Sequence, residues 1–177
     1  MVCAYIGLGA NLGDPPRQIR EALDRLAGRA GVRLEVCSSL YRSRPMGPQD
    51  QPAFANAAAR LETQCEPLDL LDILQTVERS LGRDRGKERH WGPRLLDLDL
   101  LLYGNEILRH PRLSLPHPGL TEREFVVVPL LEIAPELALP DGRRLAEIAL
   151  RLPRNGLRVW EDGYTFSIPI SYTQPNP

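Results

Sequence analysis

At 177 residues the chain is long enough to bury the core of one domain, and its 42% hydrophobic and 25% charged residues are typical of a soluble globular protein. A net charge of −1 argues against a general nucleic-acid binder, whose domain is usually basic. The three cysteines lack metal-site spacing, and we see neither a signal peptide nor an apolar run of membrane-spanning length. We therefore expect a cytoplasmic protein with reduced thiols and no membrane partner.

The first predicted elements are a buried strand at 2–8 and a helix that begins after Asp14 and ends at Gly28. The helix carries its apolar residues at helical spacing from Ile19 to Leu26. Between strand and helix lies a glycine-rich turn at 7–14. Its spacing matches neither a P-loop nor a dinucleotide fingerprint, which favours a plain tight turn over a phosphate-binding loop.

Two further strands are predicted at 32–43 and 54–62, separated by a Pro- and Gly-rich loop at 44–52. The first strand would place Val32, Leu34, Val36, Ser38 and Leu40 on one face. In the second, Phe54 and Asn56 share a face, a pairing that suits a flat heterocycle but also fits a core phenylalanine beside a surface asparagine.

A second helix begins at Pro67, and Gly82 ends it. Its buried stripe runs from Leu70 to Leu81. Gln75 and Glu78 are three residues apart, so they face one place, which is either a solvated surface or a binding site.

The most informative strand follows at about 95–103. Asp97 and Asp99 lie on one face, and Leu96, Leu98, Leu100 and Leu102 lie on the opposite, core-facing side. Two carboxylates roughly 6.6 Å apart along a strand can hold a divalent cation, although a half-exposed strand with both acids in water gives the same pattern.

A basic run precedes this strand and consists of Arg83, Arg85, Lys87, Arg89 and Arg94. Guanidinium groups for phosphate oxygens beside carboxylates for Mg²⁺ are the combination that nucleoside-triphosphate chemistry needs.

The elements from 2 to 103 are ordered strand, helix, strand, strand, helix, strand. This order predicts an α+β fold, the ferredoxin-like split β-α-β sandwich, with helices on one face of an antiparallel sheet. Residues 126–131 form a further apolar helical turn. Asp141-Gly142 is a turn, and Leu145, Ile148 and Leu150 predict a last short helix. We expect one domain at 1–150 and an extension at 151–177, with a possible hairpin around Asp162-Gly163 and a frayed tail.

The segment W-G-P-R-x-x-D-L-D-L-L at 91–101 resembles the signature of the 6-hydroxymethyl-7,8-dihydropterin pyrophosphokinase family. Further resemblance lies in G-x-N-L-G at 9–13, P-x-G-P-Q-D-Q-P at 45–52 and L-x-L-P-H-P at 113–118. Together these pieces cover about residues 3–150. The chain departs from the family pattern at Ala10, where serine is common, and at Arg44, where proline or glutamate is common.

The resemblance implies an enzyme of folate biosynthesis that transfers the β,γ-diphosphate of ATP to the hydroxymethyl group of the pterin and releases AMP. It implies two Mg²⁺ ions held by Asp97 and Asp99, with Arg83 and Arg94 as further catalytic residues. The implied pterin contacts are Ser43, Met46, Phe54, Asn56 and Phe125. The implied ATP contacts are Gln75, Glu78, Arg83, Arg85, Trp91, Arg94, Leu100, Arg112, Ser114, His117 and Arg123.

Loop 83–91 is one residue longer than in some family members, so either Arg89 or His90 fills the basic position of that loop. The expected partners are the two small-molecule substrates, without nucleic acid, and the expected state is a monomer.

Two other functional classes share this fold. A ferredoxin-like RNA-binding domain needs an aromatic-glycine motif on its central strands, which the predicted strands lack, and only 6% of residues are aromatic. A ligand-binding regulatory module would have no reason for paired aspartates beside Arg94.

Overall fold

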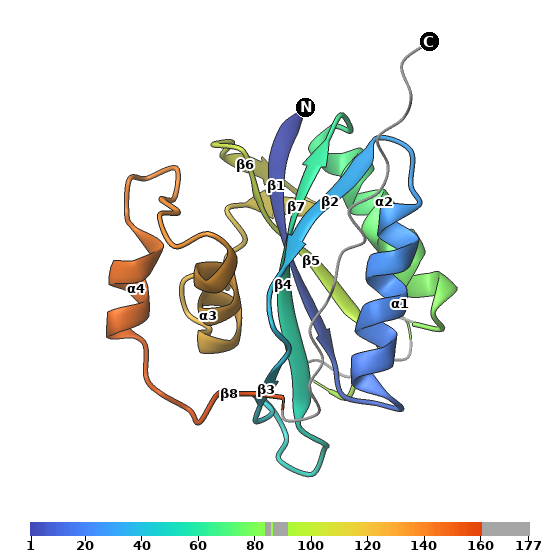
Figure 1. The fold of residues 1–177 in the computed structure, drawn as a ribbon, viewed down its shortest axis with the longest axis vertical. Helices are drawn as coiled ribbons and strands as arrows, with labels where there is room; N and C mark the ends of the chain where they lie inside the picture. The colour runs from blue at the N-terminus through green and yellow to red at the C-terminus, as the bar shows by residue number, and fades with distance from the viewer. Residues whose placement is uncertain (84–85, 87–91, 161–177) are drawn as a thin grey trace.

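The computed structural model describes residues 1–83, 86 and 92–160, and within them an antiparallel sheet is covered by helices on both faces (Figure 1). The strand order is β5-β1-β4-β3-β8, and β2 pairs with the other half of β4. Strands β6 and β7 form a separate hairpin. The elements are β1 Val2–Ala10, α1 Pro15–Ala27, β2 Val32–Cys37, β3 Tyr41–Ser43, β4 Phe54–Thr63, α2 Pro67–Ser80, β5 Asp97–Tyr103, β6 Leu108–His110, β7 Leu113–Leu115, α3 Glu124–Ile133, α4 Leu145–Arg151 and β8 Arg158–Val159.

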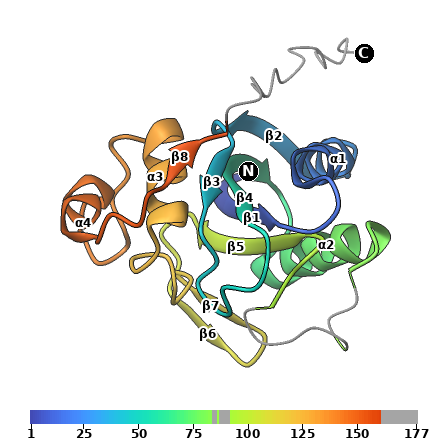
Figure 2. The same ribbon diagram turned by 90° about the horizontal axis from the view of Figure 1, so that it is seen from below.

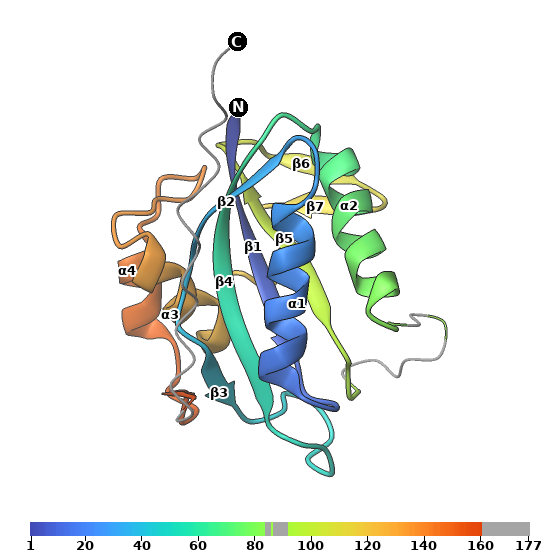
Figure 3. The same ribbon diagram turned by 45° about the vertical axis from the view of Figure 1, so that its right-hand side comes forward.

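Helices α1 and α2 pack side by side on one face of the sheet and close the larger core (Figure 3). Asp14 is the N-cap of α1, as predicted, because its carboxylate accepts from the amide of Arg17 at 3.2 Å. Ile6, Leu61 and Leu74 from three elements are fully buried between the layers. The helical spacing of apolar residues predicted α1 and α2, and the apolar runs predicted the strands that they cover.

The two helices of the predicted split β-α-β unit, α1 and α2, lie on one face as predicted, and α3 and α4 cover the opposite face. Ala58 of β4 belongs to a second core, together with Leu101, Val127 and Leu130. Helices α3 and α4 follow residues 2–103, on which the fold prediction was based. They partly cover the face of β4 that α1 and α2 leave open.

A register shift in β5 corrects the predicted position of Leu102. Tyr5 pairs with Leu102 but Ile6 pairs with Leu100, so Leu101 is an extra residue opposite β1. A bulge of this kind inverts the alternation of side chains beyond it. Leu100 therefore stays in the first core, whereas Leu102 joins Leu101 in the second.

The predicted strand at 32–43 is two strands, β2 and β3, with a break at residues 38–40. The hydroxyl of buried Ser38 accepts from the amide of Ala58 at 3.0 Å, while the amide of Ser38 donates to the carbonyl of Ala58. A register shift between Leu34 and Val36 also brings Cys37, rather than Val36, onto the first core. After the break, β3 pairs with the first residues of β4, from Phe54 to Asn56.

The C-terminal part of the described chain returns to the sheet. Residues 152–157 lead from α4 to β8, which pairs antiparallel with β3. The rest of the predicted hairpin, with Asp162-Gly163, lies outside the described residues. None of the helices in the described part combines the length and hydropathy that crossing a membrane requires. Cys3, Cys37 and Cys65 are free thiols.

The last helix gives a direct test of the fold, because the sequence pattern and the structure disagree on Leu150. Ile148 is 9% exposed against α3, whereas Leu150 is 86% exposed. We expect Ile148→Ala to lower the free energy of unfolding by about 2 kcal/mol and Leu150→Ala to change it by less than about 0.5 kcal/mol. Urea denaturation of both variants measures this, and equal losses would contradict the placement of α4.

Candidate functional site

A cavity of about 330 Å³ lies on the side of the sheet that faces the start of α3. Strands β1, β3, β4 and β5 all contribute to its wall, together with the loop after β3 and the segment that leads into α3. Every residue implied for pterin binding lines it, as do six of the other implied site residues. These eleven are Ser43, Met46, Phe54, Asn56, Arg83, Arg94, Asp97, Asp99, His117, Arg123 and Phe125.

Five implied ATP contacts lie outside the cavity wall. Leu100 faces the first core, because side chains alternate along β5 and its side chain lies on the other face of the strand from that of Asp99. Arg112 forms an ion pair with Asp72 of α2. The other three are Gln75, Glu78 and Ser114. Arg85, Trp91, Arg89 and His90 lie outside the described residues.

One end of the cavity combines aromatic rings with a polar pair. Phe54 and Asn56 point to the same face of β4, and Phe125 comes from the first turn of α3. Asn56 is only 4% exposed and donates from Nδ2 to the hydroxyl of Ser43 at 2.8 Å. This end can hold a flat heterocycle between apolar surfaces and bind its polar edge.

Gly7 and Gly9 of β1 line the cavity. The predicted strand ended at residue 8 and so included Gly7, whereas Gly9 was assigned to the turn alone. Gly7 pairs with Asp99 and Gly9 with Asp97. A Cβ atom at Gly9 would lie 3.5 Å from the side-chain oxygen of Asn56, in space that is now open. The signal available in the sequence was the alternation of the glycines. It leaves room at Gly9, whereas a Cβ atom at Gly7 would lie 3.5 Å from the side chain of Leu101.

The other end of the cavity is strongly charged. Arg83 and Arg94 form ion pairs with Asp97, and the charge of Arg123 acts on Asp99; Arg44 also lines the cavity. This excess of positive charge is suited to an anionic ligand such as a polyphosphate. Arg44 was not among the predicted site residues, although it follows Ser43 directly.

The two aspartates have different surroundings. Asp97 binds Arg83 at 2.5 Å and also pairs with Arg94. Burial raises the pKa of the Asp99 carboxyl to about 7, with a further contribution from the charge of Asp97, against the opposing effect of Arg123. Two neighbouring carboxylates, one of them buried, fit a divalent cation, which favours their charged forms.

Mg²⁺ is the cation that fits this donor set, because it is commonly bound by one or two carboxylates and completes its shell with water and substrate phosphates. The described residues contain no cluster of three or more potential metal ligands.

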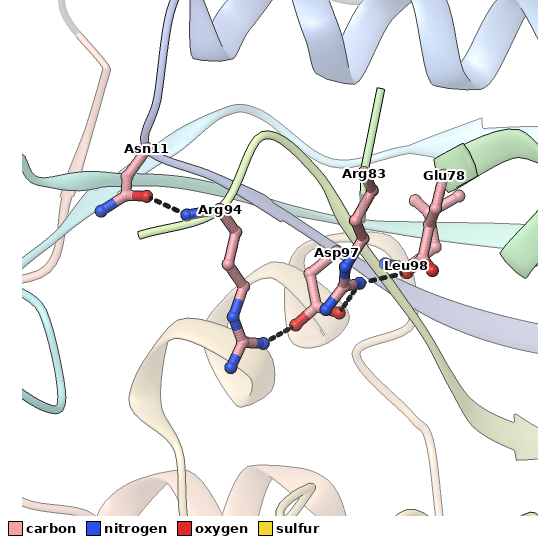
Figure 4. A network of polar contacts seen from close by, with 6 residues as sticks. All are labelled: Asn11, Glu78, Arg83, Arg94, Asp97 and Leu98. Atoms are coloured by element: carbon pink, nitrogen blue, oxygen red, sulfur yellow. Dashed lines mark hydrogen bonds and ion pairs between the residues drawn. The ribbon is translucent and has the colours of Figure 1, made fainter. Parts of the chain in front are cut away.

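Buried Glu78 fixes the position of Arg83 (Figure 4). Its carboxylate is 1% exposed and accepts from Arg83 at 2.5 Å and from the amide of Leu98 at 2.8 Å. Arg83 in turn bridges to Asp97 at 2.5 Å. Glu78 does not line the cavity but orients Arg83, which does. Its bond to the amide of Leu98 also connects the end of α2 to the start of β5.

Asn11 joins three segments around the charged end, and sequence analysis gave it no role. Its side-chain oxygen accepts from the amide of Arg94 at 2.7 Å (Figure 4), and its Nδ2 donates to Gln51 and to the carbonyl of Pro52. The amides of Asn11 and Leu12 donate to the carbonyl of Arg94. Asn11 thus holds the backbone of Arg94 beside the loop that follows β3.

His117 lines the charged end as a neutral imidazole. Burial and the charge of Arg123 lower its pKa. Nδ1 accepts from the amide of Gly119 at 3.1 Å, so the ring proton lies on Nε2. His117 can therefore donate one hydrogen bond to a phosphate oxygen.

Comparisons with known proteins agree with this geometry. The model of the 7,8-dihydro-6-hydroxymethylpterin-pyrophosphokinase family matches residues 5–135. A 2-amino-4-hydroxy-6-hydroxymethyldihydropteridine pyrophosphokinase from Haemophilus influenzae is 49% identical over 148 residues, covering 84% of this chain and 91% of the relative. Its counterpart from Pseudomonas aeruginosa is 48% identical over 153 residues, covering 86% of this chain and 93% of the relative.

A solved structure, Plasmodium falciparum HPPK-DHPS with pteroate, has a similar fold. Its TM-score is 0.68 at 14% sequence identity, and the match covers 85% of this chain but only 42% of that longer chain. At this identity the likeness concerns the fold alone.

The network around Glu78 gives a testable stability prediction. Glu78→Ala removes the carboxylate from Arg83 and from the amide of Leu98, and we expect the free energy of unfolding to fall by about 3 kcal/mol or more. Glu78→Gln keeps an acceptor for that amide and should lose less. Urea denaturation measures both. Glu136→Ala, at the exposed pair with Arg144, is the control and should show no measurable loss. An equal effect of Glu78→Ala and the control would argue against an anchoring role.

Proposed function

Because the chain belongs to the 7,8-dihydro-6-hydroxymethylpterin-pyrophosphokinase family, we propose that its cavity is the active site of this folate-biosynthesis reaction. The enzyme is a diphosphotransferase that pyrophosphorylates hydroxymethyldihydropterin with ATP. The observation that carries the assignment is that aromatic, amide and paired carboxylate side chains implied for the site all line one cavity.

The aromatic end of the cavity would bind the pterin. Phe54 and Phe125 would lie against the faces of the ring, and Asn56 would bind its polar edge. The hydrogen bond from Asn56 to Ser43 supports this role, because it fixes the orientation of the amide before the ligand binds. Met46 would close the same end, with backbone groups of Ser43 and Met46 as further hydrogen-bonding partners.

The charged end would bind the triphosphate. Arg83, Arg94 and Arg123 would neutralise phosphate oxygens, and His117 would donate from Nε2. The contacts expected from Gln75, Leu100, Arg112 and Ser114 lie outside the cavity wall and stay predictions for the remainder of the nucleotide. Those of Arg85 and Trp91 stay predictions as well.

In the proposed reaction the hydroxymethyl oxygen attacks the β-phosphorus of ATP, the bond to the α-phosphate oxygen breaks, and AMP leaves. The proton of the hydroxyl is released to solvent. Asp97 and Asp99 would hold two Mg²⁺ ions, which neutralise phosphate charge and acidify the attacking hydroxyl when bound. The residues of the chain then have to align the oxygen and the phosphorus and exclude water, so no dedicated general base is required. We also propose a cytoplasmic monomer without nucleic-acid partners.

An AMP-release assay tests the reaction. ATP, Mg²⁺ and hydroxymethyldihydropterin should yield AMP, and omission of the pterin or addition of EDTA should abolish it. ADP as the product would mean γ-phosphoryl transfer and would overturn the attack at the β-phosphorus. Pterin binding without nucleotide turnover would favour a non-catalytic binding module.

Substitutions of the paired aspartates test the metal site. We expect Asp97→Asn and Asp99→Asn each to lower turnover more than about 100-fold, because each removes a charged metal ligand. Without metal, Asp99→Asn should be at least as stable as the wild type, because burial beside Asp97 disfavours the charged carboxylate. Asp24→Asn, on the exposed side of α1, is the matched control and should leave turnover unchanged. Retained activity in Asp99→Asn would remove Asp99 from the metal site.

A further inference from the structure

Residues 153–160, here termed the C-terminal strap, cross from α4 to the outer side of β3 (Figure 2). The strap follows the domain predicted from sequence, and no function was assigned to it. Most of its residues are exposed, and only Leu157 and Trp160 are half-buried.

At its C-terminal end the strap pairs with β3. Val159 lies opposite Tyr41, and Arg158 lies opposite Arg42. The amide of Trp160 donates to the carbonyl of Leu40 at 2.8 Å. The ring of Trp160 packs against the first core, and the guanidinium of Arg42 lies 5.5 Å from its centroid.

This pairing matters because β3 has only three residues. Its other neighbour among the described strands is β4, so without β8 it would be a short edge strand. Such strands open locally at low free energy, because few contacts hold them. The strap thus gives β3 a second partner along its outer side.

At its N-terminal end the strap holds α3. The amide of Asn155 donates to the carboxylate of Glu124 at 2.9 Å. Glu124 is the first residue of α3 and directly precedes Phe125. One short segment therefore contacts two elements that are far apart in the sequence.

Both elements carry walls of the cavity. Strand β3 ends at Ser43, whose hydroxyl accepts from Asn56, and α3 begins beside Phe125. A second cavity of about 640 Å³ lies between the strap and these elements, and Ser43 and Phe125 line both cavities. The strap itself does not line the first cavity, so any effect on a ligand there must act through β3 and α3.

We propose that the C-terminal strap is a positioning segment for the pterin, which fixes Ser43 on β3 relative to Phe125 on α3. This inference rests on the proposed function of the aromatic end of the cavity. Without the strap, the arrangement of the two walls that binds the pterin is populated for a smaller fraction of the time. The apparent dissociation constant of the pterin rises by the inverse of that fraction. At the charged end, Arg83 and Arg94 are held by Glu78 and Asn11, whereas Arg123 directly precedes Glu124 and lines the second cavity with the strap. The affinity for nucleotide therefore falls less than the affinity for the pterin.

Full-length variants that remove backbone donors test this inference. Asn155→Pro and Trp160→Pro each delete one amide that ties the strap to α3 or to β3. Asn155→Ala and Trp160→Phe are the matched controls, because they keep those amides and, for Trp160, an aromatic ring. Equilibrium binding is measured for hydroxymethyldihydropterin, and separately for a non-hydrolysable ATP analogue with Mg²⁺.

We expect the double proline variant to bind the pterin about tenfold more weakly and the nucleotide analogue within about twofold of the wild type. The double control should bind both ligands within about twofold of the wild type. An unchanged pterin dissociation constant in the proline variant would overturn the inference, as would an equal loss of pterin and nucleotide binding. If the double variant does not fold, the single Asn155→Pro variant applies the same test with a smaller expected change. A wild-type chain that binds nucleotide but not pterin would instead overturn the proposed function.

Discussion

A carboxylate buried at the end of α2 determines the geometry of the charged half of the site. Glu78 receives hydrogen bonds from Arg83 and from the backbone of β5, so one side chain sets both the direction of a guanidinium and the start of the strand with the aspartates. A buried ion pair contributes little net stability compared with apolar packing, whereas loss of one partner is costly. Its role here is to orient Arg83 toward Asp97 before any ligand binds.

The cavity exists because the sheet lacks side-chain volume at one place. Gly7 and Gly9 lie opposite the two aspartates; the space beside Gly9 is open, whereas Leu101 of the second core lies beside Gly7. The bulge at Leu101 separates this region from the rest of β5, where Leu102 turns into the core under α3. Strands β1, β4 and β5 thus contribute to the core over part of their length and to the wall of the cavity over another part.

The charges of the site favour function over stability. Asp97 is compensated by Arg83 and Arg94, whereas burial, together with the charge of Asp97, raises the pKa of Asp99. A bound metal ion would supply positive charge to the two carboxylates, and the phosphate groups on that metal would accept hydrogen bonds from the guanidinium groups. The folded protein therefore holds an electrostatic arrangement that is complete only with its ligands.

The sequence by itself determined the residues that alternate or repeat at a regular spacing. These include the buried stripes of α1 and α2, the shared face of Phe54 and Asn56, and the shared face of Asp97 and Asp99. Side-chain periodicity is a local property of the backbone and can be read without the fold. The signature at 91–101 indicated the family, and the comparisons confirmed it.

Only the tertiary structure decided which of these residues meet. The break at Ser38, the bulge at Leu101, the covering of the second face by α3 and α4, and the exposure of Leu150 all depend on pairing or packing between distant segments. The roles of Glu78 and Asn11 depend on hydrogen bonds to residues 20 and 83 positions away. The approach of residues 155–160 to β3 and α3 has the same origin, because long-range contacts leave no periodic trace in the sequence.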